Sequence, residues 1–151
     1  MGFIQDWIFG KEITYNDNRI GELTARIRNK KKTKDCVWTG TYLIPGQKAE
    51  TVIILEGDNN TPFPGQIKGI YALLDNIQDI NRKVDEYWRN QPVVKQSFTA
   101  DWLDKYYIEG INPWEIEENS FEITYEQYDK DQSSYISLIW KDKEISEVEI
   151  K

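Results

Sequence analysis

Histidine is absent from the 151-residue sequence. Serine–histidine–aspartate triads, cysteine–histidine pairs and HExxH zinc sites all need an imidazole group, so each of them is excluded. The remaining options for catalysis are carboxylate, lysine and tyrosine side chains, which are common on any protein surface. We therefore expect no catalytic residues, and we expect the chain to act by binding a partner and not as an enzyme.

Cysteine and long hydrophobic runs are also scarce. The one cysteine, Cys36, excludes an internal disulfide bond and any thiolate cluster for zinc or iron, so we expect no metal and no other cofactor. The longest aliphatic run is the four residues 52–55, which is far too short to span a membrane. The N-terminal segment lacks the basic and apolar regions of a secretion signal. These features predict a cytoplasmic protein without membrane contact.

The acidic charge is distributed unevenly along the chain, whose net charge is −7 at pH 7. Lysine and arginine nearly balance aspartate and glutamate in residues 1–60, whereas acidic residues dominate residues 61–151. An acidic surface repels nucleic-acid phosphates and attracts basic proteins. We therefore expect a basic protein partner and no nucleic-acid binding.

The hydrophobic pattern predicts a single α+β domain over residues 1–151. Strand-like patterns, either alternating or rich in β-branched and aromatic residues, occur at 21–28, 37–43, 51–55, 121–126, 135–140 and 144–150. Over about 64–89 apolar residues recur every three or four positions, which predicts one long helix. A hairpin connection is expected at 29–35, and a short helix at about 99–105 with Thr99 as its cap. We predict a mainly antiparallel sheet of about six or seven strands packed on the one long helix, plus the short helix.

Several short motifs follow one another along the chain. They are Gly21-Glu-Leu23, Trp38-Thr-Gly-Thr-Tyr42, Leu55-Glu-Gly-Asp58 at a strand end, Pro64-Gly-Gln66 at a helix start, and a hairpin with Tyr125 and Trp140. In this order they resemble small uncharacterised bacterial domains that are found near polymorphic toxin genes. The resemblance implies an immunity protein, which binds a cognate toxin domain and blocks it. Such domains tend to carry an acidic residue and a histidine in the last hairpin loop. Residues 129–134 hold no histidine, so a site in that loop would be lost here.

The strongest candidate for a binding surface is the acidic and aromatic stretch 101–131. Aromatic side chains give large, rigid contact areas, and carboxylates around them can pair with the basic groups that a nuclease uses to hold phosphates. The residues predicted to bind the partner are Asp101, Trp102, Asp104, Tyr106, Glu109, Trp114, Glu115, Glu117 and Glu118. The same stretch is also explained by aromatic residues in the core and carboxylates exposed to solvent.

Two other functions are compatible with the sequence. A small-ligand or carbohydrate-binding accessory domain would need a concave pocket lined by Trp102 and Trp114, since sugar rings stack on exposed indoles. A carboxylate-dependent enzyme would need two acidic side chains that converge in a cleft and have raised pKa values.

Overall fold

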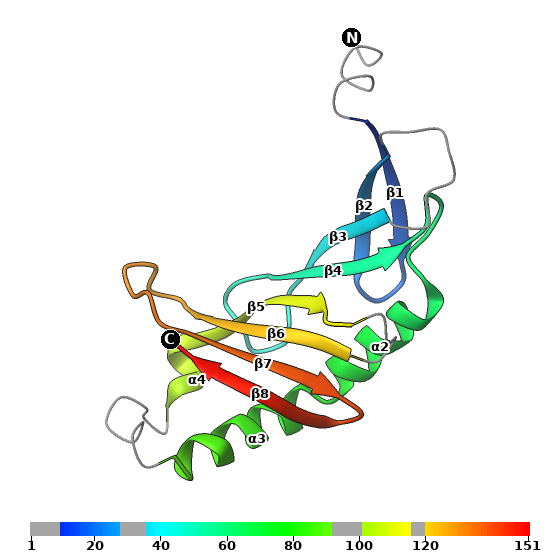
Figure 1. Ribbon diagram of the computed structural model, residues 1–151. Helices are drawn as coiled ribbons and strands as arrows, with labels where there is room; N and C mark the ends of the chain where they lie inside the picture. The colour runs from blue at the N-terminus through cyan, green and yellow to red at the C-terminus, as the bar shows by residue number, and fades with distance from the viewer. Residues whose placement is uncertain (1–9, 28–35, 92–100, 116–119) are drawn as a thin grey trace.

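A single sheet is the centre of the structure, which is a computed structural model and describes residues 10–27, 36–91, 101–115 and 120–151. The described residues form one eight-stranded sheet, in which the strands lie side by side in chain order. The strands are β1 (Lys11–Asp17), β2 (Gly21–Ile27), β3 (Cys36–Tyr42), β4 (Thr51–Gly57), β5 (Tyr106–Pro113), β6 (Ser120–Gln127), β7 (Tyr135–Lys141) and β8 (Glu144–Ile150). Figure 1 shows the β1–β2 hairpin at one extreme of the sheet and β8 at the other.

Two helices connect β4 to β5 and pack on one face of the sheet. α2 (Pro64–Asp75) begins with a proline, whose fixed φ and missing N–H suit the first helical position, and α3 (Ile77–Arg89) follows it. Strands β4 and β5 run parallel, whereas every other pair of neighbours in the described sheet is antiparallel. A parallel pair needs a long crossover connection, and the two helices supply it. In Figure 1 they follow one another along the sheet.

The core lies between these helices and the sheet face that they cover. Residues of β4 alternate, so that Ile53 and Leu55 are buried toward the helices while the residues between them are half-buried on the other side. Trp38 of β3 and Trp140 of β7 belong to the same hydrophobic cluster, together with Ile70 of α2. The parallel β4–β5 pair divides the sheet into two halves, β1–β4 and β5–β8, and one core extends across both.

The prediction of one long helix is wrong, because the helix divides at Asn76. This residue has φ −108° and ψ 12°, which is outside helical geometry. Its backbone N–H donates to Leu73 O at 2.9 Å and its side-chain amide donates to Ala72 O at 2.7 Å, so both close the end of α2. Asparagine often competes in this way for backbone hydrogen bonds. Apolar residues keep their helical spacing on both sides of Asn76, so periodicity alone does not reveal the break.

The prediction of about six or seven strands is also wrong, since the sheet has eight. The sequence pattern misses β1, because this edge strand is exposed or half-buried throughout and carries polar residues such as Lys11 and Glu12. It also misses β5, because a bulge between Ile108 and Gly110 interrupts the alternation.

The short helix is α4 (Trp102–Lys105), a single turn that leads directly into β5. The predicted cap, Thr99, and the predicted hairpin connection at 29–35 lie outside the described residues.

Candidate protein-binding surface

The predicted binding residues begin at α4, where charged and aromatic side chains have different surroundings. Asp101 and Asp104 are exposed. Trp102 is only 2% exposed, and its ring centroid lies 5.5 Å from that of Tyr125. Tyr125 faces the helices, because its buried hydroxyl donates to Asn81 Oδ1 at 2.7 Å. Trp102 is therefore part of the core and is not available to a partner in this fold.

Two predicted residues lie within β5 itself. Tyr106 is half-buried, and its hydroxyl bonds with Ser134 Oγ at 2.7 Å and accepts from Gln127 Nε2 at 3.1 Å. Glu109 is half-buried at the bulge of the strand. These hydrogen bonds hold the Tyr106 side chain against the sheet, and both side chains are only partly exposed.

Two further predicted residues lie at the other end of β5. Trp114 and Glu115 follow the strand directly and are exposed, while Asp101 and Asp104 precede it. A strand of eight residues is about 26 Å long, so the acidic residues before β5 are far from the acidic residue after it. Glu117 and Glu118 lie outside the described residues. The structure thus does not gather the predicted residues on one continuous surface.

The sheet face opposite the helices, here called the uncovered face, has a consistent pattern of its own. Within the described part of the chain, no helix lies on it. Strand alternation and register place on this face Glu22, Thr24 and Arg26, Val37, Thr39 and Thr41, Val52, Ile54 and Glu56, Asn112, Glu122, Thr124 and Glu126, and Ser137, Ile139 and Lys141. The face is thus a mixture of neutral polar, aliphatic and acidic side chains, with two basic ones, Arg26 and Lys141.

Trp114 joins this face beside an acidic and an aliphatic residue. The parallel pairing of β4 with β5 is in register at Val52–Gly110 and Ile53–Ile111. Continued along the chain, this register would bring Trp114, which follows β5, level with Glu56. Glu56 is directly opposite Val37 of β3. Trp114 is 43% exposed and Val37 is 57% exposed, which is unusual for such large apolar side chains. With the register continued in this way, Trp114 and Val37 would lie on either side of the Glu56 carboxylate.

A second carboxylate lies one row further along the uncovered face. Glu122 of β6 is opposite Asn112 on β5 and opposite Ile139 on β7. Its Oε1 accepts a hydrogen bond from Ser137 Oγ at 2.9 Å, which fixes the orientation of the carboxylate. Glu122 therefore presents a negative charge near Trp114, and Glu56 presents a second one on the neighbouring strand β4.

The end of the uncovered face near the β6–β7 loop is closer to neutral. Lys130 Nζ donates to Glu126 Oε2 at 2.8 Å and to the Tyr107 hydroxyl at 2.7 Å. The hydrogen bond to Glu126 raises the pKa of Lys130, and the hydrogen bond to Tyr107 raises it further. The Tyr107 ring stacks on Tyr128 with centroids 4.8 Å apart. The charge of Glu126 is therefore already matched within the chain.

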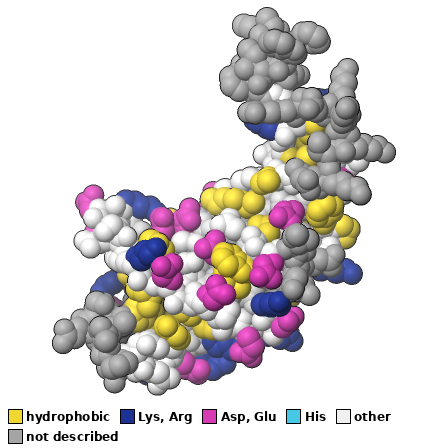
Figure 2. All heavy atoms as spheres, viewed as in Figure 1, with side chains coloured by type: hydrophobic (Ala, Val, Ile, Leu, Met, Phe, Trp, Pro, Cys, Tyr) yellow, Lys and Arg dark blue, Asp and Glu magenta, His cyan; other side chains and the backbone are white. Residues whose placement is uncertain are grey.

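Figure 2 shows one side of the molecule, on which acidic side chains lie among hydrophobic and basic ones and do not form a single patch. This distribution differs from the one compact acidic surface that the sequence suggested. The useful feature for binding is therefore local: an exposed aromatic residue with carboxylates beside it.

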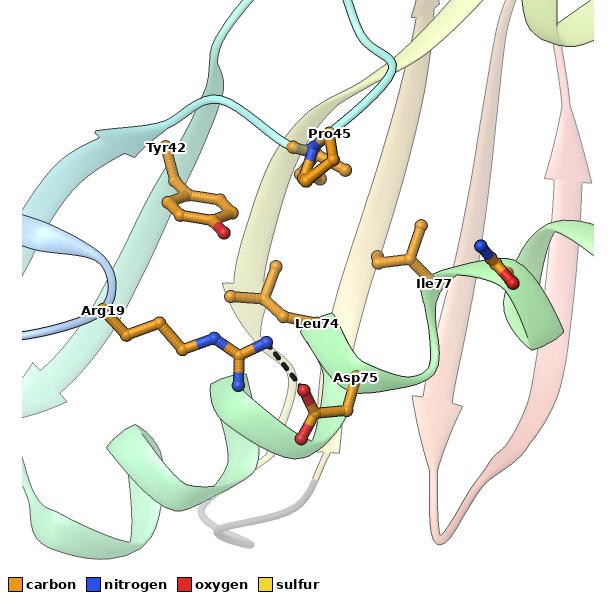
Figure 3. A pocket seen from close by; sticks show the side chains of 8 residues that line it. Arg19, Tyr42, Pro45, Leu74, Asp75 and Ile77 are labelled. Atoms are coloured by element: carbon orange, nitrogen blue, oxygen red, sulfur yellow. Dashed lines mark hydrogen bonds and ion pairs between the residues drawn. The ribbon is translucent and has the colours of Figure 1, made fainter.

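A shallow hollow of about 360 Å³ lies between the β1–β2 turn, the loop after β3 and the junction of α2 with α3. Its lining residues are Arg19, Tyr42, Ile44, Pro45, Leu74, Asp75, Ile77 and Gln78. Figure 3 shows the Arg19 side chain extended toward Asp75, and the two are joined at 2.7 Å. The Arg19 guanidinium also lies over the Tyr71 ring, 5.3 Å from its centroid.

The hollow does not match the predicted sugar site, because neither Trp102 nor Trp114 lines it. Its one arginine is paired with its one carboxylate, and the bond to Asp75 raises the pKa of Arg19. The lining side chains come from segments far apart in the sequence, so no local sequence pattern predicts the hollow.

Sequence reasoning selected Trp114 but missed Val37, Glu56 and Glu122. Alternation within each strand indicates that these side chains share one side, but only the order and register of β3 to β6 bring them together. In the described part of the chain, no three cysteine, aspartate or glutamate side chains gather closely enough to hold a metal ion.

Comparison with protein-family models, with curated proteins and with solved structures finds no match to this chain. None of the helices within the described ranges combines the length and the apolar character that crossing a membrane requires.

Proposed function

We propose that this chain is an immunity-type inhibitor, which binds a basic toxin domain through its uncovered face. The observation that carries the proposal is the exposed Trp114 at the end of β5, with Glu122 on the neighbouring strand β6 and the Val37–Glu56 pair on β3 and β4. Aromatic residues next to aliphatic ones are common centres of protein interfaces, and carboxylates around them select a partner with lysine and arginine. The motif resemblance to immunity domains and the net charge of −7 support the same class of partner.

The proposed mechanism is steric and electrostatic, without any turnover. An indole that becomes fully buried at an interface contributes strongly to affinity, while the surrounding charges speed up the encounter. The inhibitor would cover the basic groups with which a nuclease toxin holds phosphates. We further propose that binding takes place in the cytoplasm, a location that suits a chain with one cysteine.

The first test is the neighbouring gene, where the proposal expects a toxin; the C-terminal domain of that toxin is then the partner for binding measurements. Trp114→Ala should raise the dissociation constant about 30-fold, which corresponds to about 2 kcal/mol for a central aromatic residue. The double variant Glu56→Lys, Glu122→Lys should raise it about tenfold or more and slow association. Isothermal titration calorimetry and surface plasmon resonance measure these changes.

The matched control is Glu86→Lys on α3, which reverses an exposed charge on the helix side of the sheet. It should leave the affinity within about twofold of the unmodified chain, because rim and distant charges contribute little. Equal effects of the two charge reversals would exclude the uncovered face as the interface. Failure of the unmodified chain to bind or inhibit the toxin domain would overturn the proposed function itself.

A further inference from the structure

The two outer strands of the sheet protect their edges very differently. β8 has a register shift opposite Ser137 and Ile139, and Glu147 adopts a positive φ of 49°. Irregularities and charges of this kind discourage pairing with another strand. β1 pairs with β2 over seven consecutive residues without any shift, and in the described sheet it has a neighbour on one side only. Its outer edge is therefore regular and suited to accept another strand.

The sequence of β1 is complementary to itself when it is reversed. In an antiparallel pair centred on Thr14, Lys11 of one copy is opposite Asp17 of the other, and Ile13 is opposite Tyr15. Glu12 meets the neutral Asn16, and Thr14 meets Thr14. Opposite charges, an aromatic residue beside a β-branched one, and paired threonines each stabilise an antiparallel sheet.

Other pairings of the edges lose this complementarity. If the centre of the pair moves from Thr14 to Ile13 or Tyr15, the helices of both copies still lie on the same side of the sheet. Both contacts between Lys11 and Asp17 are then lost. Pairing two copies of β8 in the same way places Glu147 opposite Glu147, and like charges directly opposite one another are destabilising. The register centred on Thr14 is thus the one that matches charge, apolar and polar residues together.

We propose that two copies of this chain associate through antiparallel pairing of their β1 strands, with a two-fold axis at Thr14. The axis is perpendicular to the sheet, as it must be when two identical strands pair antiparallel in one continuous sheet. The helices of both copies then lie on one side, and the two uncovered faces lie together on the other. Because the contact is a strand edge of limited area, the dimer is reversible and depends on concentration.

The direct test is cysteine cross-linking on the axis. In the proposed register the two Thr14 Cα atoms are about 5 Å apart, within the range of a disulfide. Asn16 is opposite Glu12 of the other copy, so the two Asn16 Cα atoms are about 13 Å apart and cannot be bridged. Under mild oxidation Thr14→Cys should form a covalent dimer and Asn16→Cys should not, and the unmodified chain, whose Cys36 is buried, should not either. Far-UV circular dichroism checks that both variants are folded.

A second measurement needs no oxidation. Sedimentation equilibrium of the unmodified chain should show a mass that rises from 17.9 kDa toward twice that value as concentration increases. Lys11→Asp replaces two attractive contacts by repulsive ones and should raise the dimer dissociation constant about tenfold. Lys143→Asp, at the exposed turn before β8, should leave it unchanged. A chain that stays at 17.9 kDa at every concentration, or equal cross-linking of Thr14→Cys and Asn16→Cys, would overturn the proposal.

Discussion

At the scale of single residues, Asp17 joins the turn after β1 to helix α2. Its Oδ1 accepts hydrogen bonds from the backbone N–H of Arg19 at 2.8 Å and of Ile20 at 2.9 Å, and its Oδ2 accepts one from the Tyr71 hydroxyl. Burial by itself raises the pKa of the Asp17 carboxyl, but these hydrogen bonds outweigh it and lower the pKa below its ordinary value. The bond to Asp17, together with burial, raises the pKa of Tyr71 to about 12.

These shifts predict how stability depends on pH. A carboxyl with a lowered folded-state pKa stabilises the fold above its unfolded pKa of about 3.9, and this stabilisation is lost as pH falls through the folded value. Asp17→Asn should therefore lower the free energy of unfolding at about pH 7, with a smaller difference from the unmodified chain at about pH 2. Urea denaturation at both pH values measures this difference. Asp131→Asn, which removes a carboxyl from an exposed loop, is the control, and equal behaviour of the two variants would contradict the role of Asp17.

Tyr71 should have the opposite pH dependence. A hydroxyl with a raised folded-state pKa stabilises the fold below its unfolded pKa of about 10, and this stabilisation is lost as pH rises through about 12. Tyr71→Phe should lower the free energy of unfolding at neutral pH. Above about pH 10 the difference in this free energy between the variant and the unmodified chain should become smaller. The measurement is urea denaturation followed by tryptophan fluorescence at about pH 7 and about pH 11. A difference that stays constant over this range would show that the bond to Asp17 does not couple to ionisation.

At the scale of elements, side chains complete the parallel junction between β4 and β5. On the side of β4, pairing with β5 begins only at Gly110, so other groups satisfy the backbone of Ile108. Ile108 N–H donates to Gln47 Oε1 at 2.9 Å, and Ile108 O accepts from the Thr51 hydroxyl at 2.6 Å. Gln47 Nε2 also donates to Thr51 Oγ1 at 3.1 Å. Gln47 and Thr51 thus replace part of the strand pairing at the point where the two halves of the sheet meet.

Removal of the Thr51 hydroxyl should therefore be costly. Thr51→Val keeps the shape of a fully buried side chain but leaves the Ile108 carbonyl without its closest donor. A buried acceptor that loses its partner costs about 1–3 kcal/mol of stability. The control is Thr41→Val on the uncovered face, where the same change at an exposed position should stay within about 0.5 kcal/mol. Similar urea midpoints for the two variants would show that Gln47 alone suffices at the junction.

The elements also show how far the sequence predicts this fold. Strands that bury one side and carry polar residues on the other, such as β6, and the helical region with its regular apolar spacing are predicted because burial imposes a period on the sequence. β1 is missed because an edge strand buries few side chains, so burial imposes no clear period on its sequence. Asn76 is missed because a break in the backbone leaves the apolar spacing intact. Both errors arise where local hydrogen bonding, and not hydrophobic burial, decides the structure.

The candidate site is predicted less well than the fold. Trp102 was expected at a binding surface, but it is buried in α4, where its ring packs on that of Tyr125, a core residue of β6. Trp114 is exposed because it follows the end of β5 on the uncovered side. Its neighbours Glu56 and Val37 come from other strands. Their proximity depends on the parallel register of β4 and β5, which no pattern within a single segment reveals.

At the scale of the whole molecule, one core holds two sheet halves together across a narrow junction. Only Val52 with Gly110 and Ile53 with Ile111 are in register between β4 and β5. The hydrophobic cluster nevertheless runs from Leu23 of β2 to the residues of β7 without division. Helix α3 reaches the far edge, where Lys83 pairs with Glu144 of β8 at 3.3 Å. The helices and the core therefore connect the halves in addition to the β4–β5 pairing.

This arrangement predicts that the two halves unfold together. Because residues of β3 and β7 share one core, opening either half exposes apolar surface of the other, so independent unfolding is costly. Hydrogen exchange in mild urea should give the same free energy of opening for the slowest amides of β3 and β7. Thr51→Val, at the junction between the halves, should lower both values equally. Loss of protection in β3 while β7 stays protected would instead mean that β1–β4 forms a separate cooperative unit, and that α2 and α3 do not transmit stability across the junction.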